Sequence, residues 1–231
     1  MRLSALLLSL LLLFTSFVPT NINDSLIDNK GLESSESVDG LYEILKSKNP
    51  EVPSKEVFRL AYSGWEKLDT QLGTRILTII DFSLPSTEKR LWVISPEQKE
   101  VLLHSVVAHG RNSGELIASK FSNRPESFQS SLGFYKTGET YQGKHGYSLR
   151  LDGLEKGVND QARNRAIVIH GADYAKESFA KINGRLGRSL GCPALPSELS
   201  TEAINLMKEG SLLFVFAEDE NYLSNSLLLQ P

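Results

Sequence analysis

The sequence predicts a mostly β fold: a mixed or antiparallel, β-sandwich-like domain with a small helical cap on its N-terminal side and one helix near its C-terminal end. Two observations predict this class. Between residues 74 and 217, short runs rich in isoleucine, valine and leucine alternate with turns that contain glycine or proline. Few of these runs are separated by a helical stretch long enough to cross over between parallel strands. We therefore expect most strand pairs to be antiparallel, with the helices packed outside the sheet.

The helical cap covers residues 41–73 and consists of two predicted helices. Apolar residues recur at helical spacing from Leu41 onward, and this first helix stops before Pro50. A second helix is expected to start after Ser54, whose hydroxyl can accept a hydrogen bond from an N–H group of the first turn. Gly73 ends the cap.

Strands and one helix make up the domain predicted at residues 74–217. A turn at Pro96 joins two of the strands into a predicted hairpin. The helix is predicted at 197–208, with Ser197 as its cap. Residues 218–231 follow the last strand as a tail. The predicted strands cover residues 75–82, 91–94, 101–108, 133–138, 147–151, 166–169 and 212–217.

Residues 1–20 are typical of a secretory signal peptide or an N-terminal anchor. Arg2 precedes an uncharged, leucine-rich run of sixteen residues that ends before Pro19. A helix of that length spans about 24 Å, less than the roughly 30 Å of a bilayer core, which favours a cleaved signal. No pair of small residues marks a cleavage site near residues 16–22, so an uncleaved anchor stays open. Residues 21–40 are polar and are predicted to form a flexible spacer.

The charge and composition of the chain argue against several kinds of partner. A formal net charge of -3 offers no basic field for the phosphates of a nucleic acid. No run of like charges suggests a membrane-binding surface, so membrane contact is expected only through an uncleaved leader. The Gly-x-x-Gly fragments do not join a strand to a helix, so no dinucleotide or phosphate loop is predicted. We expect neither a cofactor nor a metal ion.

Cys192 is the only cysteine of the chain, so it has no partner for a disulfide within it. It follows Gly191 and precedes Pro193, and His170 lies upstream at the end of a short apolar strand. A thiol with a histidine in reach is typical of a catalytic nucleophile and its general base. The alternative is a small core residue, because free cysteine is among the most buried side chains.

The residues around Cys192 supply the other groups that an acyl transfer needs. The N–H groups of Gly191 and Cys192 are predicted to face the oxyanion that forms when the thiolate attacks a carbonyl. Ser189 is expected to hold the loop through hydrogen bonds to backbone groups. Arg188 and Arg185 are predicted to bind a substrate carboxylate, for which a forked guanidinium is well suited; a solvated basic loop is the alternative.

Two further histidines are predicted to contact substrate. His109 follows the strand predicted at 101–108, and His145 lies in a turn flanked by glycines. Both are rivals of His170 as the base, and a structural or surface role is the alternative for either one. His104 and His109 have a spacing that suits neither strand alternation nor the helical i, i+4 ligands of zinc.

These motifs resemble those of the YkuD-type L,D-transpeptidases. His170-Gly171 followed by Ser189-Leu190-Gly191-Cys192 is similar to the family's His-Gly and Ser/Thr-x-Gly-Cys signature. The resemblance covers about residues 74–217 and is closer still to a divergent branch, the murein L,D-transpeptidase catalytic domain proteins. The stretches that resemble this branch are Val107-Ala108-His109-Gly110, Phe121-Ser122-Asn123, Gly143-Lys144-His145-Gly146 and Gly187-Arg188-Ser189-Leu190-Gly191-Cys192-Pro193-Ala194.

The resemblance implies a cysteine acyltransferase that is exported to the cell envelope, in the periplasm. It implies that Cys192 attacks the carbonyl of an L-centre in a peptidoglycan stem peptide, releases the following D-residue and passes the acyl group from a thioester to an amine. His170 is then the general base, and the backbone carbonyl of Gly171 orients its imidazole. Leu190 and Ala194 depart from the family, which often has histidine at the first position and asparagine or arginine at the second.

Two alternatives to the transpeptidase stay open. Water could resolve the same acyl-enzyme, which gives an L,D-carboxypeptidase. The chain could instead be a non-catalytic envelope-binding domain that keeps the fold and buries Cys192. The order of histidine before cysteine argues against papain-like peptidases, and a sortase would have an arginine soon after the cysteine. A partly exposed Cys192 in one cleft with His170 would favour the enzyme.

Overall fold

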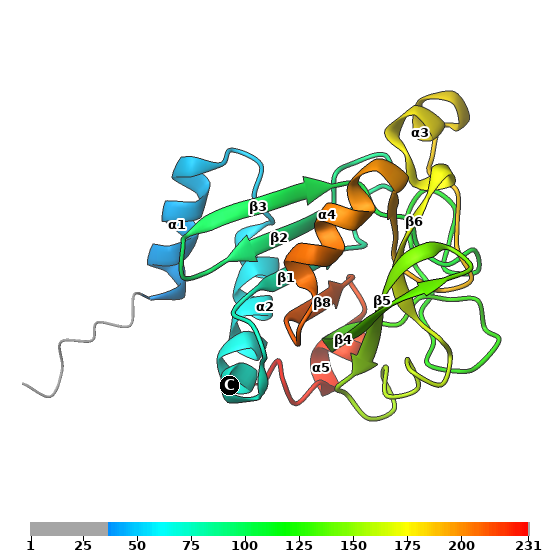
Figure 1. Cartoon of the computed structure of the whole chain (residues 1–231). Helices are drawn as coiled ribbons and strands as arrows, with labels where there is room; N and C mark the ends of the chain where they lie inside the picture. The colour runs from blue at the N-terminus through cyan, green and yellow to red at the C-terminus, as the bar shows by residue number, and fades with distance from the viewer. Residues whose placement is uncertain (1–36, 231) are drawn as a thin grey trace, which may run out of the picture. The chain divides into compact units, whose positions relative to one another are not determined.

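The computed structural model describes residues 37–230; the predicted leader (1–20) and residues 21–36 of the predicted spacer lie outside this range. Within it, eight strands form one mixed sheet in the order β3-β2-β1-β8-β4-β5-β6-β7 (Figure 1). The prediction of a mostly β fold with helices around the sheet is confirmed. The strands are β1 Leu77–Asp81, β2 Leu91–Ser95, β3 Glu100–Ser105, β4 Gly133–Gly143, β5 Gly146–Gly153, β6 Val168–Ala172, β7 Ala194–Pro196 and β8 Leu212–Phe216.

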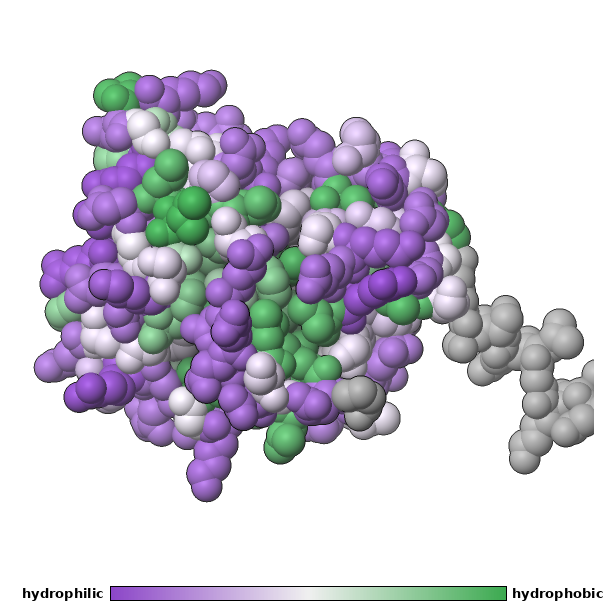
Figure 2. Space-filling model, turned by 180° about the vertical axis from the view of Figure 1, so that it is seen from behind, coloured by the Kyte–Doolittle hydropathy of each residue, from purple (hydrophilic) through white to green (hydrophobic). Residues whose placement is uncertain are grey.

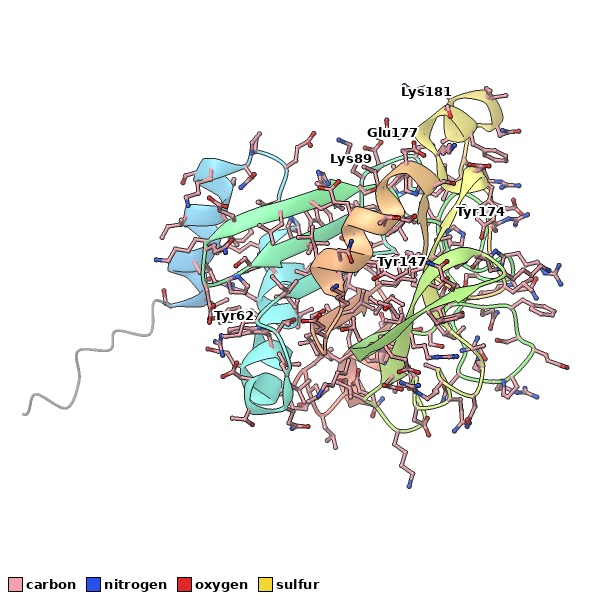
Figure 3. All side chains as sticks on the ribbon, viewed as in Figure 1. Tyr62, Lys89, Tyr147, Tyr174, Glu177 and Lys181 are labelled. Atoms are coloured by element: carbon pink, nitrogen blue, oxygen red, sulfur yellow. The ribbon has the colours of Figure 1, made fainter. Side chains whose placement is uncertain are left out.

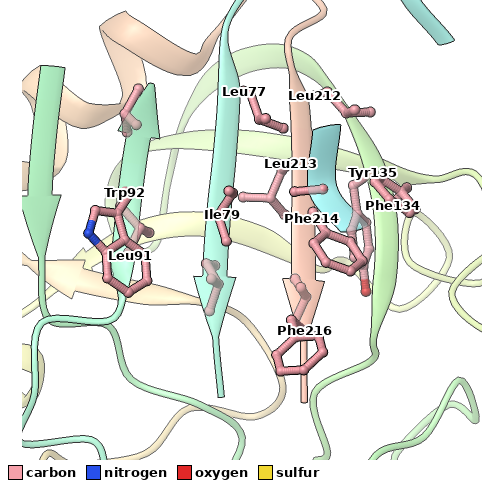
Figure 4. Packing of buried hydrophobic residues seen from close by; sticks show 14 of the residues in the cluster. Leu77, Ile79, Leu91, Trp92, Phe134, Tyr135, Leu212, Leu213, Phe214 and Phe216 are labelled. Atoms are coloured by element: carbon pink, nitrogen blue, oxygen red, sulfur yellow. The ribbon is translucent and has the colours of Figure 1, made fainter. Parts of the chain in front are cut away.

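The centre of the sheet is covered on both faces. All residues of β1, β2 and β8 are buried, which explains why these segments read as continuous apolar runs rather than as alternating ones. β1 and β8 are parallel, with Ile79 beside Phe214. Figure 4 shows the side chains of β2, β1, β8 and β4 packed next to one another. The rings of Phe134 and Phe214 stack at 4.3 Å between centroids.

The sheet curls until the chain that leaves β3 meets β7 at the other edge. Ala108 N donates to Ala194 O at 2.8 Å, and Ala194 N donates back to Ala108 O at 3.3 Å. Next to this pair, Ser189 N donates to His109 O and Arg111 N donates to Ser189 O, both at 2.9 Å. The segment after β3 therefore supports the loop that leads into β7.

The two predicted helices of the cap are present as α1 (Val38–Lys48) and α2 (Lys55–Leu68), the first starting before the predicted Leu41. Ser54 Oγ accepts a hydrogen bond from Val57 N at 3.2 Å, which confirms its predicted role as the cap of α2. Gly64 lies on the buried face of α2. A Cβ atom there would sit 2.2 Å from the Phe134 ring, so glycine lets the helix approach the sheet closely.

Helix α4 (Ser197–Met207) lies in front of the sheet in Figure 1. The prediction that Ser197 caps this helix is wrong, because Pro196 is the N-cap residue. Ser197 is already in the first turn, and its hydroxyl donates to Asp173 Oδ1 at 2.8 Å. Tyr147, labelled in Figure 3, joins β5 to the same helix through a hydrogen bond from its hydroxyl to Asn205 Oδ1 at 3.2 Å.

Two short helices were not predicted: α3 (Glu177–Asn183), which lies between β6 and β7 in the chain, and α5 (Glu220–Asn225), which lies in the predicted tail. The tail is docked on the domain through Glu155, a buried carboxyl group. Glu155 accepts hydrogen bonds from Phe134 N at 2.7 Å, from the Tyr222 hydroxyl at 3.0 Å and from Ser226 Oγ.

A second cavity lies outside the site described below. A cavity of about 760 Å³ lies between α2 and the C-terminal segment, where Leu60 and Leu229 line it. Figure 2 shows apolar side chains gathered between polar ones on the back of the molecule. None of the residues that line this cavity lines the one described below, around His170 and Cys192. No helix in residues 37–230 has the length and apolarity to cross a bilayer.

Candidate active site

His170 is held rigidly by its place in β6. Its backbone pairs with Ser148 on one side and with Ala194 on the other, and the residue is only 2% exposed. The ring nitrogen Nδ1 lies 2.9 Å from Gly171 O. Because a backbone carbonyl can only accept, Nδ1 carries the hydrogen, and the neutral ring keeps Nε2 as its basic atom.

Cys192 reaches β6 because β7 pairs with that strand in parallel, starting two residues after the cysteine. The half-buried thiol donates to Ala166 O at 3.7 Å. Gly191 has a φ of 126°, and a Cβ there would lie 2.9 Å from Gln129 O. Only glycine fits both the dihedral angle and the close approach of the 129 backbone, so Gly191 sets the direction in which Cys192 leaves the loop.

Ser189 closes the loop around these residues. Its Oγ donates to Cys192 O at 2.6 Å and accepts from Gly191 N at 3.0 Å. Ser130 Oγ donates to Gly191 O at 3.1 Å from the other side. The Gly191 N–H group, predicted to face an oxyanion, is thus used inside the loop.

Cys192 and His170 line one cavity of about 440 Å³. Its polar lining includes three cations, Lys144, Arg165 and Arg188, and none of the described residues that line it is an aspartate or a glutamate. An electropositive hollow of this kind attracts an anionic group. Nowhere in residues 37–230 do three or more histidine, cysteine, aspartate or glutamate side chains group as they would to hold a metal ion.

Burial favours the uncharged form of both Cys192 and His170. It raises the pKa of the Cys192 thiol, although the Val168 backbone and the Arg165 charge oppose the rise. It lowers the pKa of His170, against the hydrogen bond to Gly171 O, and the neighbouring His145 adds to the lowering. A neutral thiol and a neutral imidazole in one cavity suit general-base activation of the thiol.

His145 is brought to the site, from the turn between β4 and β5. Its ring stacks on that of His170 with 4.4 Å between centroids and 26° between planes. The side chain also lines the Cys192 cavity. The hairpin register, which pairs Gly143 with Gly146, holds His145 at the tip of the hairpin.

His109 lies outside the cavity, in the segment that supports the cysteine loop. It is 1% exposed; Arg90 Nη2 donates to its Nδ1 at 2.8 Å, and its Nε2 lies 3.2 Å from Gly114 O. Since arginine can only donate, Nε2 carries the hydrogen. Burial, aided by the Arg90 charge, lowers the pKa of His109 to about 4. This histidine is a neutral bridge between a buried arginine and a carbonyl.

The two arginines predicted to bind a carboxylate share a carboxylate of the protein itself. Arg188 Nη1 lies 2.5 Å from Glu115 Oε1, and Arg185 Nε lies 3.0 Å from Glu115 Oε2. Arg188 also lines the Cys192 cavity, whereas Arg185 does not. The structure therefore brings together Cys192, His170 and Arg188 and leaves Arg185 outside.

Arg165 is a member of the site that the sequence did not reveal. Its guanidinium donates to Ser122 O at 2.7 Å and to Gln129 O at 2.6 Å, which fixes it beside Cys192. The next residue, Ala166, has a φ of 53° and accepts the thiol's hydrogen bond, so the backbone beside the thiol is strained. All hydrogen-bond partners of the Arg165 guanidinium lie more than thirty residues earlier in the chain, so no local pattern marks it.

Two other cavity residues, Tyr174 and Lys144, carry no sequence signal of their own. Tyr174, labelled in Figure 3, follows β6 and lines the cavity with Cys192. Burial, and the charge of the Cys192 thiolate when it forms, raise the pKa of Tyr174 to about 12, so its phenol stays a neutral donor. Lys144 precedes His145 in the hairpin turn. A single lysine in a turn is usually a solvated side chain, so the sequence alone gives Lys144 no role.

Comparison with known proteins identifies the family of the chain. The family model described as L,D-transpeptidase catalytic domain matches residues 48–216. No curated protein matches the chain.

Three solved structures are similar to the chain at low identity. An L,D-transpeptidase from Mycobacterium smegmatis is 13% identical with a TM-score of 0.38, over 62% of this chain and 59% of that one. The helical cell shape determining protein Pgp2 from Campylobacter jejuni is 14% identical with a TM-score of 0.42, over 77% and 62%. An Enterococcus faecium L,D-transpeptidase is 14% identical with a TM-score of 0.37, over 62% and 50%. The chain thus spans about half to three fifths of the length of these proteins. Because the family model matches residues 48–216, which is most of the chain, the chain belongs to the family of L,D-transpeptidase catalytic domains.

Proposed function

We propose that this chain is a cysteine acyltransferase that carries out L,D-transpeptidation on peptidoglycan stem peptides through a thioester acyl-enzyme. The observation that carries the proposal is the shared cavity of Cys192 and His170, in which Gly171 O holds the imidazole by its Nδ1. That hydrogen bond leaves Nε2 as the atom that can take the thiol proton. No side-chain acid is needed to orient the ring, because the carbonyl does so.

Acylation begins when His170 Nε2 accepts the proton of Cys192. The sulfur attacks the carbonyl carbon of the L-centre, and the carbonyl oxygen becomes an oxyanion. The tetrahedral intermediate then collapses: the bond to the D-residue nitrogen breaks, His170 returns its proton to that nitrogen, and the free D-amino acid leaves. The product on the protein is a thioester at Cys192.

Deacylation repeats these steps with an amine as the nucleophile. His170 takes a proton from the attacking amine, the thioester carbon forms an amide bond, and the thiolate leaves and recovers the proton. Water in place of the amine would give a carboxylic acid instead. The outcome depends on which nucleophile reaches the thioester.

The oxyanion is assigned to the N–H group of Cys192. The Gly191 N–H group already donates to Ser189 Oγ at 3.0 Å, so it has no hydrogen free for substrate in the resting loop. An N–H group on the nucleophile's own residue lies close to any carbonyl that the sulfur attacks.

The lining of the cavity supports an anionic substrate. A stem peptide that ends in a D-amino acid has a free carboxylate next to the bond that is cleaved. Lys144 and Arg188 are the cations we assign to it, with Arg165 adding positive charge beside Cys192. Arg188 remains partly engaged by Glu115, so Lys144, for which the structure shows no partner among residues 37–230, is the main contact.

We also propose that residues 1–20 export the chain to the cell envelope, in the periplasm, where its substrate lies. Residues 21–40 would then link this leader to the cap at 41–73 and the catalytic domain at 74–217. The uncharged run after Arg2 supports the proposal.

The test is to incubate the purified full chain with stem-peptide muropeptides and to analyse protein and products by mass spectrometry. We expect an acyl adduct on Cys192, release of the terminal D-residue, and a cross-linked or D-amino-acid-exchanged product. Loss of the D-residue without any amide product would replace the transpeptidase by an L,D-carboxypeptidase. Cys192→Ala should lose every one of these products, and turnover by that variant would refute the assigned nucleophile.

A further inference from the structure

We propose that His145 is a positioning residue for His170: its ring covers one face of the base, limits rotation of the imidazole, and places a second ionisable ring against it. The proposal rests on the role of His170 as general base. It adds to that role a second histidine, from a different hairpin, that acts on the base rather than on the substrate.

The first support is the geometry of the two rings. The centroids are 4.4 Å apart and the planes differ by 26°, which is face-to-face packing. The hydrogen bond to Gly171 O fixes the Nδ1 edge of His170. A ring that lies flat on the imidazole restricts the remaining motion, tilting about that bond, and so keeps Nε2 aimed in one direction.

The second support is where His145 is anchored. It lies at the tip of the β4–β5 hairpin, and β5 pairs directly with β6 so that Ser148 lies beside His170. The turn is short, and Gly146 has a φ of 77°, so the chain reverses within a few residues. His170 in β6 and His145 in the turn before β5 are thus positioned by adjacent strands of one sheet.

The charges around His170 come from several elements, and the His145 ring packs directly against it. Cys192 lines the cavity of His170 from the loop before β7, and the phenols of Tyr141 in β4 and of Tyr174 after β6 line it too. Lys144 from the hairpin, Arg165 from the segment before β6 and Arg188 from the cysteine loop add fixed positive charge. A protonated His145 adds one more cation against the ring face and so makes the imidazolium of His170 less favourable.

The experiment follows the protonation of His170 directly. The chain has four histidines, so the ring signals can be assigned in NMR spectra by removing them one at a time. His170 is titrated in the wild type, in His145→Phe, which keeps a stacked ring without charge, and in His145→Ala, which removes the ring. His104→Phe is the matched control, because His104 also stacks on an aromatic ring, Trp92 at 4.8 Å, but lines a different cavity.

We expect His170 to protonate at higher pH in His145→Phe than in the wild type, and His104→Phe to leave it unchanged. Turnover should change in the same direction. His145→Phe should have a kcat/KM within about twofold of the wild type near pH 8 and roughly threefold lower near pH 5.5. His145→Ala should have a kcat roughly tenfold lower at both pH values, with a smaller change in KM.

Two results would overturn the proposal. One is a His170 titration that is the same in His145→Phe and in the wild type. The other is a rise in KM with kcat unchanged in His145→Ala, which would make His145 a substrate contact instead. The titration needs no substrate, so it still decides the role of His145 if the chain forms no peptidoglycan product.

Discussion

At the scale of single residues, three histidines in and around the site differ in their surroundings. His170 is bonded to a carbonyl and open to the cavity, His145 covers it, and His109 is a buried bridge to Arg90. Their residue type is the same, and their neighbours decide what each can do. The same holds for Arg165. Its charge lowers the pKa of Cys192 because hydrogen bonds to another segment, such as the one to Gln129 O, hold the guanidinium beside the thiol.

The depressed pKa of His109 predicts that folding is weakened in mild acid. The pKa falls from about 6.5 in an unfolded chain to about 4 in the folded protein, so between these values the unfolded chain binds more protons. The free energy of unfolding should therefore decrease as the pH drops through this window, by up to about 3 kcal/mol from this residue. Urea unfolding at several pH values measures it.

The comparison variant is His109→Gln, which has no titratable ring. Its stability should be lower near pH 7 but should change less between about pH 6.5 and about pH 4. His170 has a lowered pKa of the same sign, so a smaller slope remains. Equal slopes in both proteins would mean that His109 does not carry this dependence.

At the scale of elements, pairing between strands brings the site together. Cys192 and His170 are separated by helix α3 and a loop, and the parallel pair β6–β7 joins them. The edge of β7 is supported in turn by the segment that follows β3. The helices pack against the sheet from outside, and Gly64 of α2 shows how closely one of them approaches it.

Gly64→Ala tests this fit between α2 and β4. Alanine is the better helix former by about 1 kcal/mol, but its Cβ would lie 2.2 Å from the Phe134 ring. We expect the clash to prevail and the free energy of unfolding to fall by about 1–3 kcal/mol. Glu66→Ala, at an exposed position of the same helix, should change it by less than about 0.5 kcal/mol. A Gly64→Ala protein more stable than the wild type would show that the helix can move away without loss.

At the scale of the whole molecule, the C-terminal segment is bound to the sheet through one buried carboxyl group, Glu155. Tyr222 and Ser226 donate to Glu155, which also accepts from Phe134 N in β4. A buried carboxyl group has to be fully hydrogen-bonded, so these donors secure the segment to the sheet. Residues 218–230 are thus part of the packed structure although the sequence reads as a tail.

Tyr222→Phe separates this fold contact from the chemistry. Removal of the hydroxyl leaves Glu155 with one donor fewer, and the free energy of unfolding should fall by about 1–3 kcal/mol. Tyr147→Phe, whose hydroxyl bonds at the surface, should cost less than about 0.5 kcal/mol. Alkylation of Cys192, the only thiol, should proceed at the wild-type rate in the folded Tyr222→Phe protein. A slower rate would show that α5 is coupled to the site.

Local patterns in the sequence determined most of the elements and the pair of residues on which the proposed chemistry depends. Apolar runs between turns mark the strands, Ser54 marks the start of α2, and the signature at His170 and Cys192 marks the family, because each of these signals lies within a few neighbouring residues. Short α3 and α5 carry weak periodicity and were missed.

Only the tertiary structure decided which of the other polar residues meet. It placed His145 on His170 and Arg165 beside Cys192, tied Arg185 to Glu115, and buried His109 against Arg90. These contacts join segments far apart in the chain, and their strength depends on burial and on hydrogen bonds that form only when the sheet curls. The sequence by itself determined a β domain with the cysteine and the histidine of the family signature; the curled sheet decided what surrounds them.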